Sequence, residues 1–327
     1  MDNYPISPVQ LGHFFQVDGK QLQQQYKNHL SDYHQWKQKD HAEHWMVFEQ
    51  NIGPYLSIDE TAFSSGELYT IVTNKAAKGR RGSIVAMIKG TQADYLINIL
   101  NKIPKRLRRT VLEVTIDMSA SLNLAIKRCF PNADRVIDRF HVQQLAFDAV
   151  QETRIKYRWE ALEEENKAYE QARKQKIAYQ PEVLHNGDTV KQLLARSRYL
   201  LFKQPRLWTR EQQQRAELLF TRYPVIQKAY QLSLGLGDVF RICTSKEQAF
   251  KRLALWYNDV DTSGIQSFKT LSRTVQNHYL GILNFFNNRA TNAAAESFNA
   301  KVKSFRNAMR GVRDVNLFLF RLVKLYA

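Results

Sequence analysis

The sequence predicts an α/β protein whose mixed sheet is interrupted by a large all-α segment. Three apolar runs rich in strand-forming residues come first, at about 55–59, 67–73 and 83–89, and helical and strand patterns alternate after them. A dinucleotide-binding fold would alternate from its first strand and would carry a glycine-rich first turn, which this sequence lacks. From about 151 to 280 the sequence is charged and compatible with long helices, which indicates an all-α insertion.

The remaining elements follow from local patterns. Residues 1–50 are rich in Gln, His and Trp, and the segment 19–49 is predicted to be helical until Gly53-Pro54 breaks the pattern. After the three strands, in chain order, we expect a helix at 92–102, a strand at 111–117, a helix at 119–130, a strand at 133–138 and a further helix. These elements divide the chain into an N-terminal helical region (1–50), a core formed by 51–150 with 281–327, and the insertion (151–280).

Charge indicates the kind of partner. Lys and Arg outnumber Asp and Glu by 48 to 31 among 327 residues, giving a formal net charge of +17 and a pI near 9.8. Such an excess is commonly compensated by a polyanion, most often nucleic acid, although a merely soluble basic protein is an alternative.

The sequence also indicates where the protein is located and in what state its two cysteines are. It contains no apolar stretch of membrane-spanning length and no signal-peptide pattern, so we expect a cytoplasmic protein with no membrane partner. Cys129 and Cys243 are expected to be buried thiols, because two distant cysteines make neither a disulfide framework nor a zinc site.

Acidic residues end three of the predicted strands. Asp59, Asp117 and Asp138 close apolar runs, and the carboxyl ends of neighbouring parallel strands share one crevice. Helix capping would by itself explain Asp117 and Asp138, but no helix follows Asp59. We therefore look for chemistry at this edge of the sheet.

A basic amphipathic helix near the C-terminus carries a further acid, Glu296. At 100° per residue, its face also holds Asn299, Lys303, Asn307 and Arg310, whereas Phe298, Val302, Phe305 and Met309 fall opposite. Packed by its apolar side, the helix would present Glu296 to the strand-end acids. An ordinary surface helix with Glu296 favouring the macrodipole is the alternative.

Such a set of carboxylates suits divalent metal ions. Two strand-end acids and a third from a helix can hold two ions roughly 3.5–4 Å apart, as in enzymes that cleave phosphodiesters. Mg²⁺ fits oxygen ligands of this kind, and Mn²⁺ is expected to substitute.

Basic side chains could bind a DNA backbone. The predicted set is Lys78, Arg80, Arg81, Lys105, Arg106, Arg108, Arg109, Lys303 and Arg310. A solvated turn and helix end explain the first seven equally well. Trp159, Trp208 and Trp256 could stack on an unpaired base, but such residues are more often buried in a core.

Several motifs together resemble one known family, the DDE-type transposases of bacterial insertion sequences, and most closely the ISL-three family. The matching segments are Ser57-Ile58-Asp59-Glu60-Thr61-Ala62-Phe63, Thr115-Ile116-Asp117-Met118-Ser119, Phe130-Pro131-Asn132-Ala133, Asp138-Arg139-Phe140-His141-Val142 and Asn292 to Lys303. The resemblance implies a ribonuclease-H-like catalytic domain with a helical insertion. It also implies that Asp59, Asp117 and Glu296 form the catalytic metal-binding triad, supported by Asp138, His141 and Asn299.

The implied activity is Mg²⁺-dependent cleavage of double-stranded DNA at element ends and strand transfer into target DNA, by a homo-oligomer associated with the bacterial nucleoid. Many relatives begin with a zinc finger and a helix-turn-helix, which this sequence lacks at its start. End recognition would then fall to a separate protein or to residues 19–49. Two alternatives are a non-catalytic DNA-binding or regulatory protein derived from a transposase, and a related repair nuclease.

Overall fold

The computed structural model describes residues 1–62, 66–309 and 312–327 and divides the chain into two compact units. The sheet unit comprises Met1–Asp138 and Asn288–Ala327, and the helical unit comprises Arg139–Asn287. No break occurs at 150, because one helix, α6 (Arg139–Lys174), runs without interruption from the end of the last strand. The helical unit therefore begins earlier in the chain than the insertion expected at 151–280.

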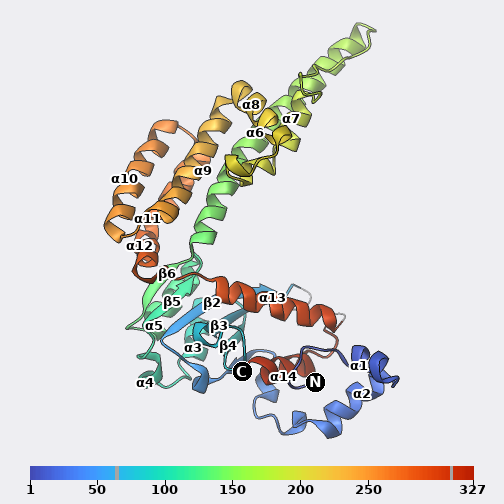
Figure 1. Cartoon of the computed structure of the whole chain (residues 1–327), viewed down its shortest axis with the longest axis vertical. Helices are drawn as coiled ribbons and strands as arrows, with labels where there is room; N and C mark the ends of the chain where they lie inside the picture. Colours follow the sequence, from blue (N-terminus) through green and yellow to red (C-terminus); the bar gives the residue numbers. More distant parts are fainter. Residues whose placement is uncertain (63–65, 310–311) are drawn as a thin grey trace. The chain divides into compact units, whose positions relative to one another are not determined.

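A six-stranded mixed sheet forms the centre of the sheet unit (Figure 1). In spatial order the strands are β1 (Trp45–Val47), β4 (Ile84–Lys89), β3 (Leu68–Asn74), β2 (Tyr55–Ala62), β5 (Glu113–Ile116) and β6 (Asp134–Ile137). Strands β2, β3 and β4 form an antiparallel meander, and β5 and β6 continue parallel to β2. This is the mixed sheet of a ribonuclease-H-like fold, and the predicted fold class is confirmed.

Helices cover both faces of the sheet. On one face α3 (Ala93–Leu100) packs against α5 (Ala120–Cys129), and they contact β4 and β5 respectively. Ser119 caps α5 by accepting a hydrogen bond from the Leu122 backbone N–H. Between these helices lies the short α4 (Lys105–Arg108). The other face is covered by α13 (Ala293–Ala308) and α14 (Val315–Tyr326), which follow the helical unit in the sequence.

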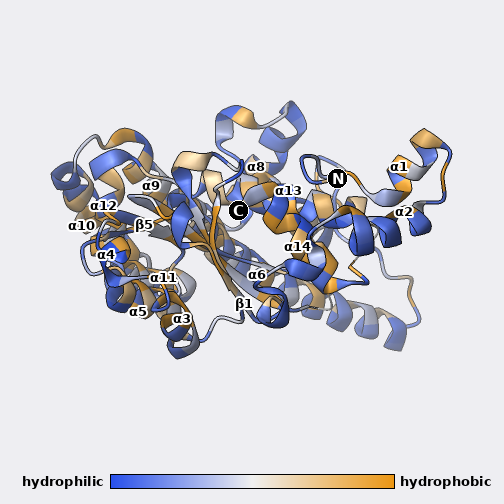
Figure 2. Cartoon of the chain, turned by 90° about the horizontal axis from the view of Figure 1, so that it is seen from below, coloured by the Kyte–Doolittle hydropathy of each residue, from blue (hydrophilic) through white to orange (hydrophobic). Residues whose placement is uncertain are grey.

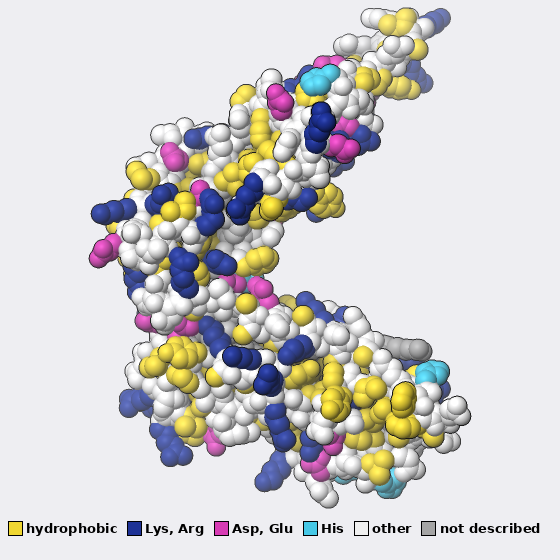
Figure 3. Space-filling view, in the orientation of Figure 1, with side chains coloured by type: hydrophobic (Ala, Val, Ile, Leu, Met, Phe, Trp, Pro, Cys, Tyr) yellow, Lys and Arg dark blue, Asp and Glu magenta, His cyan; other side chains and the backbone are white. Residues whose placement is uncertain are grey.

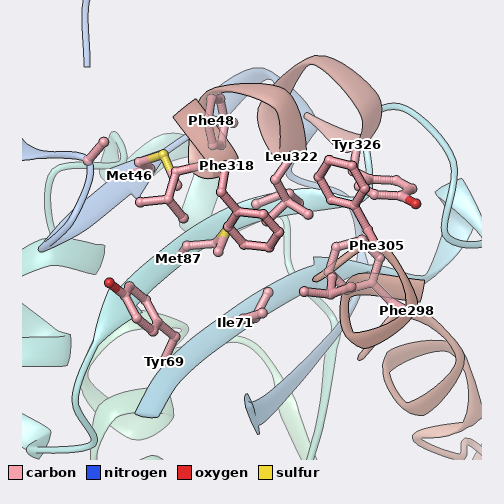
Figure 4. Close-up of a cluster of buried hydrophobic side chains, with 14 residues drawn as sticks. Met46, Phe48, Tyr69, Ile71, Met87, Phe298, Phe305, Phe318, Leu322 and Tyr326 are labelled. Atoms are coloured by element: carbon pink, nitrogen blue, oxygen red, sulfur yellow. The ribbon is translucent and has the colours of Figure 1, made fainter. Parts of the chain in front are cut away.

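The apolar side of α13 packs into the main hydrophobic core of this unit. Phe298, Val302 and Phe305, predicted to lie opposite Glu296, are each 1% exposed and contact strand residues such as Ile71 (Figure 4). The rings of Phe305 and Phe318 of α14 stack at 5.3 Å. This packing orients α13 and thereby places its polar face toward the ends of β2 and β6.

The N-terminal region, expected to be helical over 19–49, consists of short helices and turns and ends in a strand. It contains α1 (Pro8–Phe15), α2 (Gly19–Gln25), a π-helical turn (Tyr26–Leu30) and short 3₁₀ turns before β1. The Gln- and His-rich sequence offers no continuous apolar stripe to sustain a long helix, whereas Trp45 and Val47 favour a strand. The side-chain amide of Gln38 bonds both the N–H and the C=O of Val47. These bonds satisfy the outer edge of β1, which the sequence pattern did not reveal.

The helical unit consists of helices that each bury an apolar side. They are α6, α7 (Val190–Arg196), α8 (Arg210–Arg222), α9 (Pro224–Ile242), α10 (Lys246–Ser263), α11 (Gln266–Asn277) and α12 (Tyr279–Asn288). Figure 2 shows hydrophobic and hydrophilic residues alternating around the helices. Trp256 is 4% exposed and donates its indole N–H to the Leu232 carbonyl, so this tryptophan belongs to the core.

Two simpler expectations can be compared with the structure directly. Cys129 and Cys243 are buried free thiols, as predicted. Among the described residues, no helix has the length and apolar character needed to cross a membrane.

Candidate metal centre

Three acids lie in one row across neighbouring strands, with Asp59 inside β2, which continues to Ala62, and Asp117 and Asp138 directly after β5 and β6. Ser57 pairs with Thr115 in the parallel β2–β5 ladder, and continuing that register by two residues sets Asp59 beside Asp117. Ile116 pairs with Ile137 in the β5–β6 ladder, so the next step sets Asp117 beside Asp138. Because side chains alternate between the two faces of a sheet, this register directs the three positions toward the same face.

Helix α13 lies over this row and supplies two polar side chains one turn apart. Asn299 is 5% exposed and donates its side-chain N–H to Asp59 Oδ2 at 2.7 Å. A carboxylate oxygen of Glu296 lies within 4.8 Å of one from the buried Asp138. Asn299 therefore fixes the first acid of the row, and Glu296 approaches the last.

Backbone N–H groups orient Asp59 and Asp117. Asp59 Oδ1 accepts a hydrogen bond from the Glu60 N–H at 2.8 Å, and Asp117 Oδ1 accepts one from the Ser119 N–H at 2.9 Å. An ionised carboxylate has about four acceptor positions, so each acid keeps capacity for a further ligand. This arrangement orients the carboxylates without saturating them.

Glu60 is a further acid at this site, which the sequence analysis quoted in a motif without assigning it a role. Burial raises the pKa of its carboxyl above the ordinary value, and the nearby charges of Asp117 and Asp59 raise it further. Both effects favour the protonated carboxyl. The signal available in the sequence was its position beside Asp59 in an apolar strand.

We expect Glu60→Gln to stabilise the sheet unit at neutral pH. The raised pKa means that the native protein binds more protons than the unfolded chain, so wild-type stability falls as pH rises from the ordinary value of 4.5 through the raised pKa. The advantage of the variant should be greater at about pH 7.5 than at about pH 4. Denaturant unfolding with a chelator present measures it, and an equal difference at both pH values would contradict the prediction.

Asn299 is expected to act as a positioning residue for metal binding. Asn299→Leu removes the amide that holds Asp59, and losing such an outer-shell contact typically costs about 10- to 100-fold in metal affinity. Mn²⁺ titration by calorimetry measures the change. Asn307→Leu, at an exposed position of the same helix, is the matched control and should bind Mn²⁺ like the wild type. Equal affinities for the two variants would show that the Asn299 contact is not needed.

The donor set fits a hard divalent cation. Asp59, Asp117, Asp138 and Glu296 offer only carboxylate oxygens, which Mg²⁺ and Mn²⁺ prefer. Among the described acids, Asp138 and Glu296 have carboxylate oxygens within 4.8 Å of each other, whereas Asp59, Asp117 and Glu296 do not by themselves form a group with all ligand atoms within 4.8 Å. Asp138 was expected to support the site from outside the metal-binding triad, but its carboxylate lies near that of Glu296.

His141 is half-buried in the first turn of α6, three residues after Asp138. Its ring meets that of Phe140 edge-on, with centroids 6.0 Å apart. By the division of the chain it belongs to the helical unit, whereas the acids belong to the sheet unit.

The predicted DNA-binding cations do not all lie where the sequence suggested. Lys78, Arg80 and Arg81 are exposed in the turn after β3, and Lys105, Arg106 and Arg109 are exposed around α4, before β5. Asn74, at the end of β3, pairs with Leu56 near the start of β2. Both groups therefore lie at the opposite end of the strands from the acids. Lys303 is exposed on α13. Figure 3 shows Lys and Arg side chains spread over the visible face of each unit.

Arg108 was predicted among the DNA-binding cations, but its side chain is buried. It is 8% exposed, and its guanidinium donates to the Ile103 and Cys129 carbonyls at 2.9 and 2.7 Å. Its guanidinium holds α4 to the end of α5 and is not presented to DNA. Arg310, the last predicted cation, lies outside the described residues.

Comparisons with known proteins identify the family. A family model described as "Transposase", of the ISL-three DDE class, matches residues 56–322. The "Transposase for insertion sequence element IS1001" of Bordetella parapertussis is 22% identical over 271 residues, which cover 82% of this chain and 60% of that protein. Among solved structures, the "Drosophila P element transposase strand transfer complex" is 13% identical with a TM-score of 0.36, over 85% of this chain and 78% of that chain. The chain belongs to the ISL-three family of DDE transposases.

Proposed function

We propose that this chain catalyses divalent-metal-dependent DNA cleavage at the ends of an insertion sequence and joins the freed 3′ hydroxyl to target DNA. The observation that carries the proposal is the register of the sheet, which sets Asp59 beside Asp117, together with the placement of Glu296 on α13 above this edge. The chain spans 60% of the length of the IS1001 transposase, and the family membership adds support.

The metal ligands we assign are Asp59, Asp117 and Glu296, with Asp138 close enough to take part. A pair of divalent ions held there would supply Lewis-acid stabilisation of the phosphodiester and lower the pKa of a bound water or hydroxyl. The protein's own contribution is to orient Asp59 through Asn299 and Asp117 through the Ser119 N–H. His141 is assigned a supporting role near the DNA strand.

Exposed cations would hold the DNA backbone. Lys303 lies on the helix that carries Glu296. The other exposed cations lie at the opposite end of the strands and are Lys78, Arg80, Arg81, Lys105, Arg106 and Arg109. The affinity they provide should be independent of sequence and should fall steeply with salt.

End recognition is assigned either to a separate protein or to the N-terminal region. Helices α1 and α2 pack closely, since a Cβ on Gly12 of α1 would lie 2.9 Å from the backbone nitrogen of Gly19 in α2. Two helices joined by a three-residue turn are the geometry of a helix-turn-helix, and the second helix carries Lys20 and several Gln side chains. A homo-oligomer on DNA is also part of the proposal.

The test is cleavage of DNA that carries the element ends. We expect Mg²⁺- or Mn²⁺-dependent nicking at the ends and joining of the 3′ hydroxyl to a target plasmid, and no cleavage when a chelator removes the metal. DNA with scrambled ends is the control. Binding of end-containing DNA with no cleavage in either metal would support the alternative, a non-catalytic DNA-binding regulator. Cleavage of structured DNA without strand transfer would indicate a repair nuclease.

A further inference from the structure

An aromatic cavity in the helical unit has the composition of a site for an unpaired DNA base. It has a volume of about 370 Å³ and is lined by Phe250, Leu253, Tyr257, Gln276 and Tyr279. These residues come from α10, α11 and α12, which pack together in this unit. Its size lies within the range of roughly 300–1,000 Å³ that is typical of small-molecule sites.

Two aromatic rings at this cavity are open to solvent. Phe250 is 56% exposed and Tyr279 is 42% exposed. The tryptophans considered in the sequence analysis do not supply such a surface here, because Trp256 on the same helix is buried against Leu232. Exposed rings beside a cavity can stack on a base whatever its identity, because every base has an aromatic face.

Polar groups line the same cavity. The hydroxyl of Tyr257 is buried and has no hydrogen-bond partner among the described residues, and burial raises the pKa of this group to about 12. Gln276 is exposed, and its side-chain NH₂ donates to Ser272 Oγ at 3.4 Å, leaving the amide oxygen available. An apolar side chain from a protein partner would leave the Tyr257 hydroxyl unsatisfied, whereas the edge of a base offers donors and acceptors.

The charges around the cavity favour a phosphate-bearing ligand. Lys246 precedes Phe250 by one turn on α10, and Arg273 precedes Gln276 by one turn on α11. Lys246 Nζ donates to the neutral Asn284 side chain at 2.9 Å. Neither of these two cations forms an ion pair with a carboxylate of the described chain, so their charge is available to an anion.

We propose that this cavity binds an unpaired DNA base, stacked on Phe250 and Tyr279 and bonded through its edge to Tyr257 and Gln276, with the flanking phosphates near Lys246 and Arg273. The inference rests on the proposed action on DNA, because cleavage and joining expose unpaired nucleotides at DNA ends. It adds a substrate-binding site outside the metal centre.

The experiment uses the full chain, a chelator and a single-stranded oligonucleotide with one 2-aminopurine. Binding is followed by fluorescence anisotropy and stacking by quenching of the 2-aminopurine. We expect Phe250→Ala and Tyr279→Ala each to weaken binding about tenfold or more and to abolish most of the quenching. Leu255→Ala, at a 65% exposed position of the same helix, is the matched control and should behave like the wild type.

Two further arms separate base binding from other effects. On an oligonucleotide with an abasic site in place of 2-aminopurine, the wild type and Phe250→Ala should bind equally, because no ring remains to stack. Tyr257→Phe keeps the ring and should reduce binding without removing the quenching. Losses that persist on the abasic strand, or variants that bind like Leu255→Ala, would overturn the proposal.

Asp59→Asn should retain the quenching, so failure of the catalytic proposal can be told apart from failure of this one.

Discussion

Asp59→Asn is expected to reduce the rate of metal-dependent DNA cleavage by about a thousandfold or more, because it removes a charged ligand from the acid row. Asp117→Asn and Glu296→Gln should have effects of similar size. The substitutions preserve the shape of each side chain, so the fold of the sheet unit should be unchanged. Single-turnover cleavage of end-containing DNA in Mg²⁺ and in Mn²⁺ measures the loss.

Two comparisons make the result specific. Asp134→Asn changes an exposed acid at the opposite end of β6 and should retain the wild-type rate. DNA binding in the presence of a chelator should survive in all three triad variants, because phosphate contacts come from Lys and Arg and the substitutions remove negative charge. Full cleavage by any one triad variant would refute its assignment as a metal ligand.

Asp138→Asn addresses the point at which the structure departs from the expected triad. Its carboxylate lies within 4.8 Å of that of Glu296 and in the same row as Asp117. A loss as large as that of Asp59→Asn would place Asp138 among the metal ligands. A smaller loss would leave it as a supporting residue.

The sequence predicted the sheet well because the controlling signals are local. The apolar runs ending at Asp59, Asp117 and Asp138 are short, β-branched and bounded by turns, and each became a strand. The register that sets Asp59 beside Asp117 depends on hydrogen bonds between strands more than fifty residues apart in sequence. It could therefore be determined only from the structure. The buried side of α13 was predictable because its period of 3.6 residues is visible in the sequence.

Other features depend on contacts that no local pattern encodes. Arg108 looked like part of a basic patch, but its side chain turns inward to two backbone carbonyls. Asn299 was placed on the correct helix face, but its partner, Asp59, is 240 residues away. The strand β1 was missed because three residues carry little pattern and because its pairing with β4 is a tertiary contact.

Phe305→Ala is expected to destabilise the sheet unit by about 3–5 kcal/mol, the usual cost of deleting a buried aromatic side chain. Phe305 is 1% exposed, stacks on Phe318 and lies 4.9 Å from the guanidinium of the fully buried Arg321. Removing the ring leaves a cavity and also removes the cation–π contact of Arg321. Because α13 is anchored by this side, the loss should loosen the helix that carries Glu296 and Asn299.

Phe14→Ala is the matched control for this prediction, since it deletes the same side chain at a 79% exposed position and should change stability by no more than about 0.5 kcal/mol. The chain has two compact units, so unfolding must be followed with a probe in each, for example by hydrogen exchange of β3 and of α9. Phe305→Ala should lower protection in β3 and leave α9 unchanged.

Mn²⁺ should bind this variant more weakly even under conditions where it remains folded, because the position of Glu296 and Asn299 depends on how firmly α13 is packed. A variant that is destabilised but binds Mn²⁺ like the wild type would show that the metal ligands do not depend on the packing of α13.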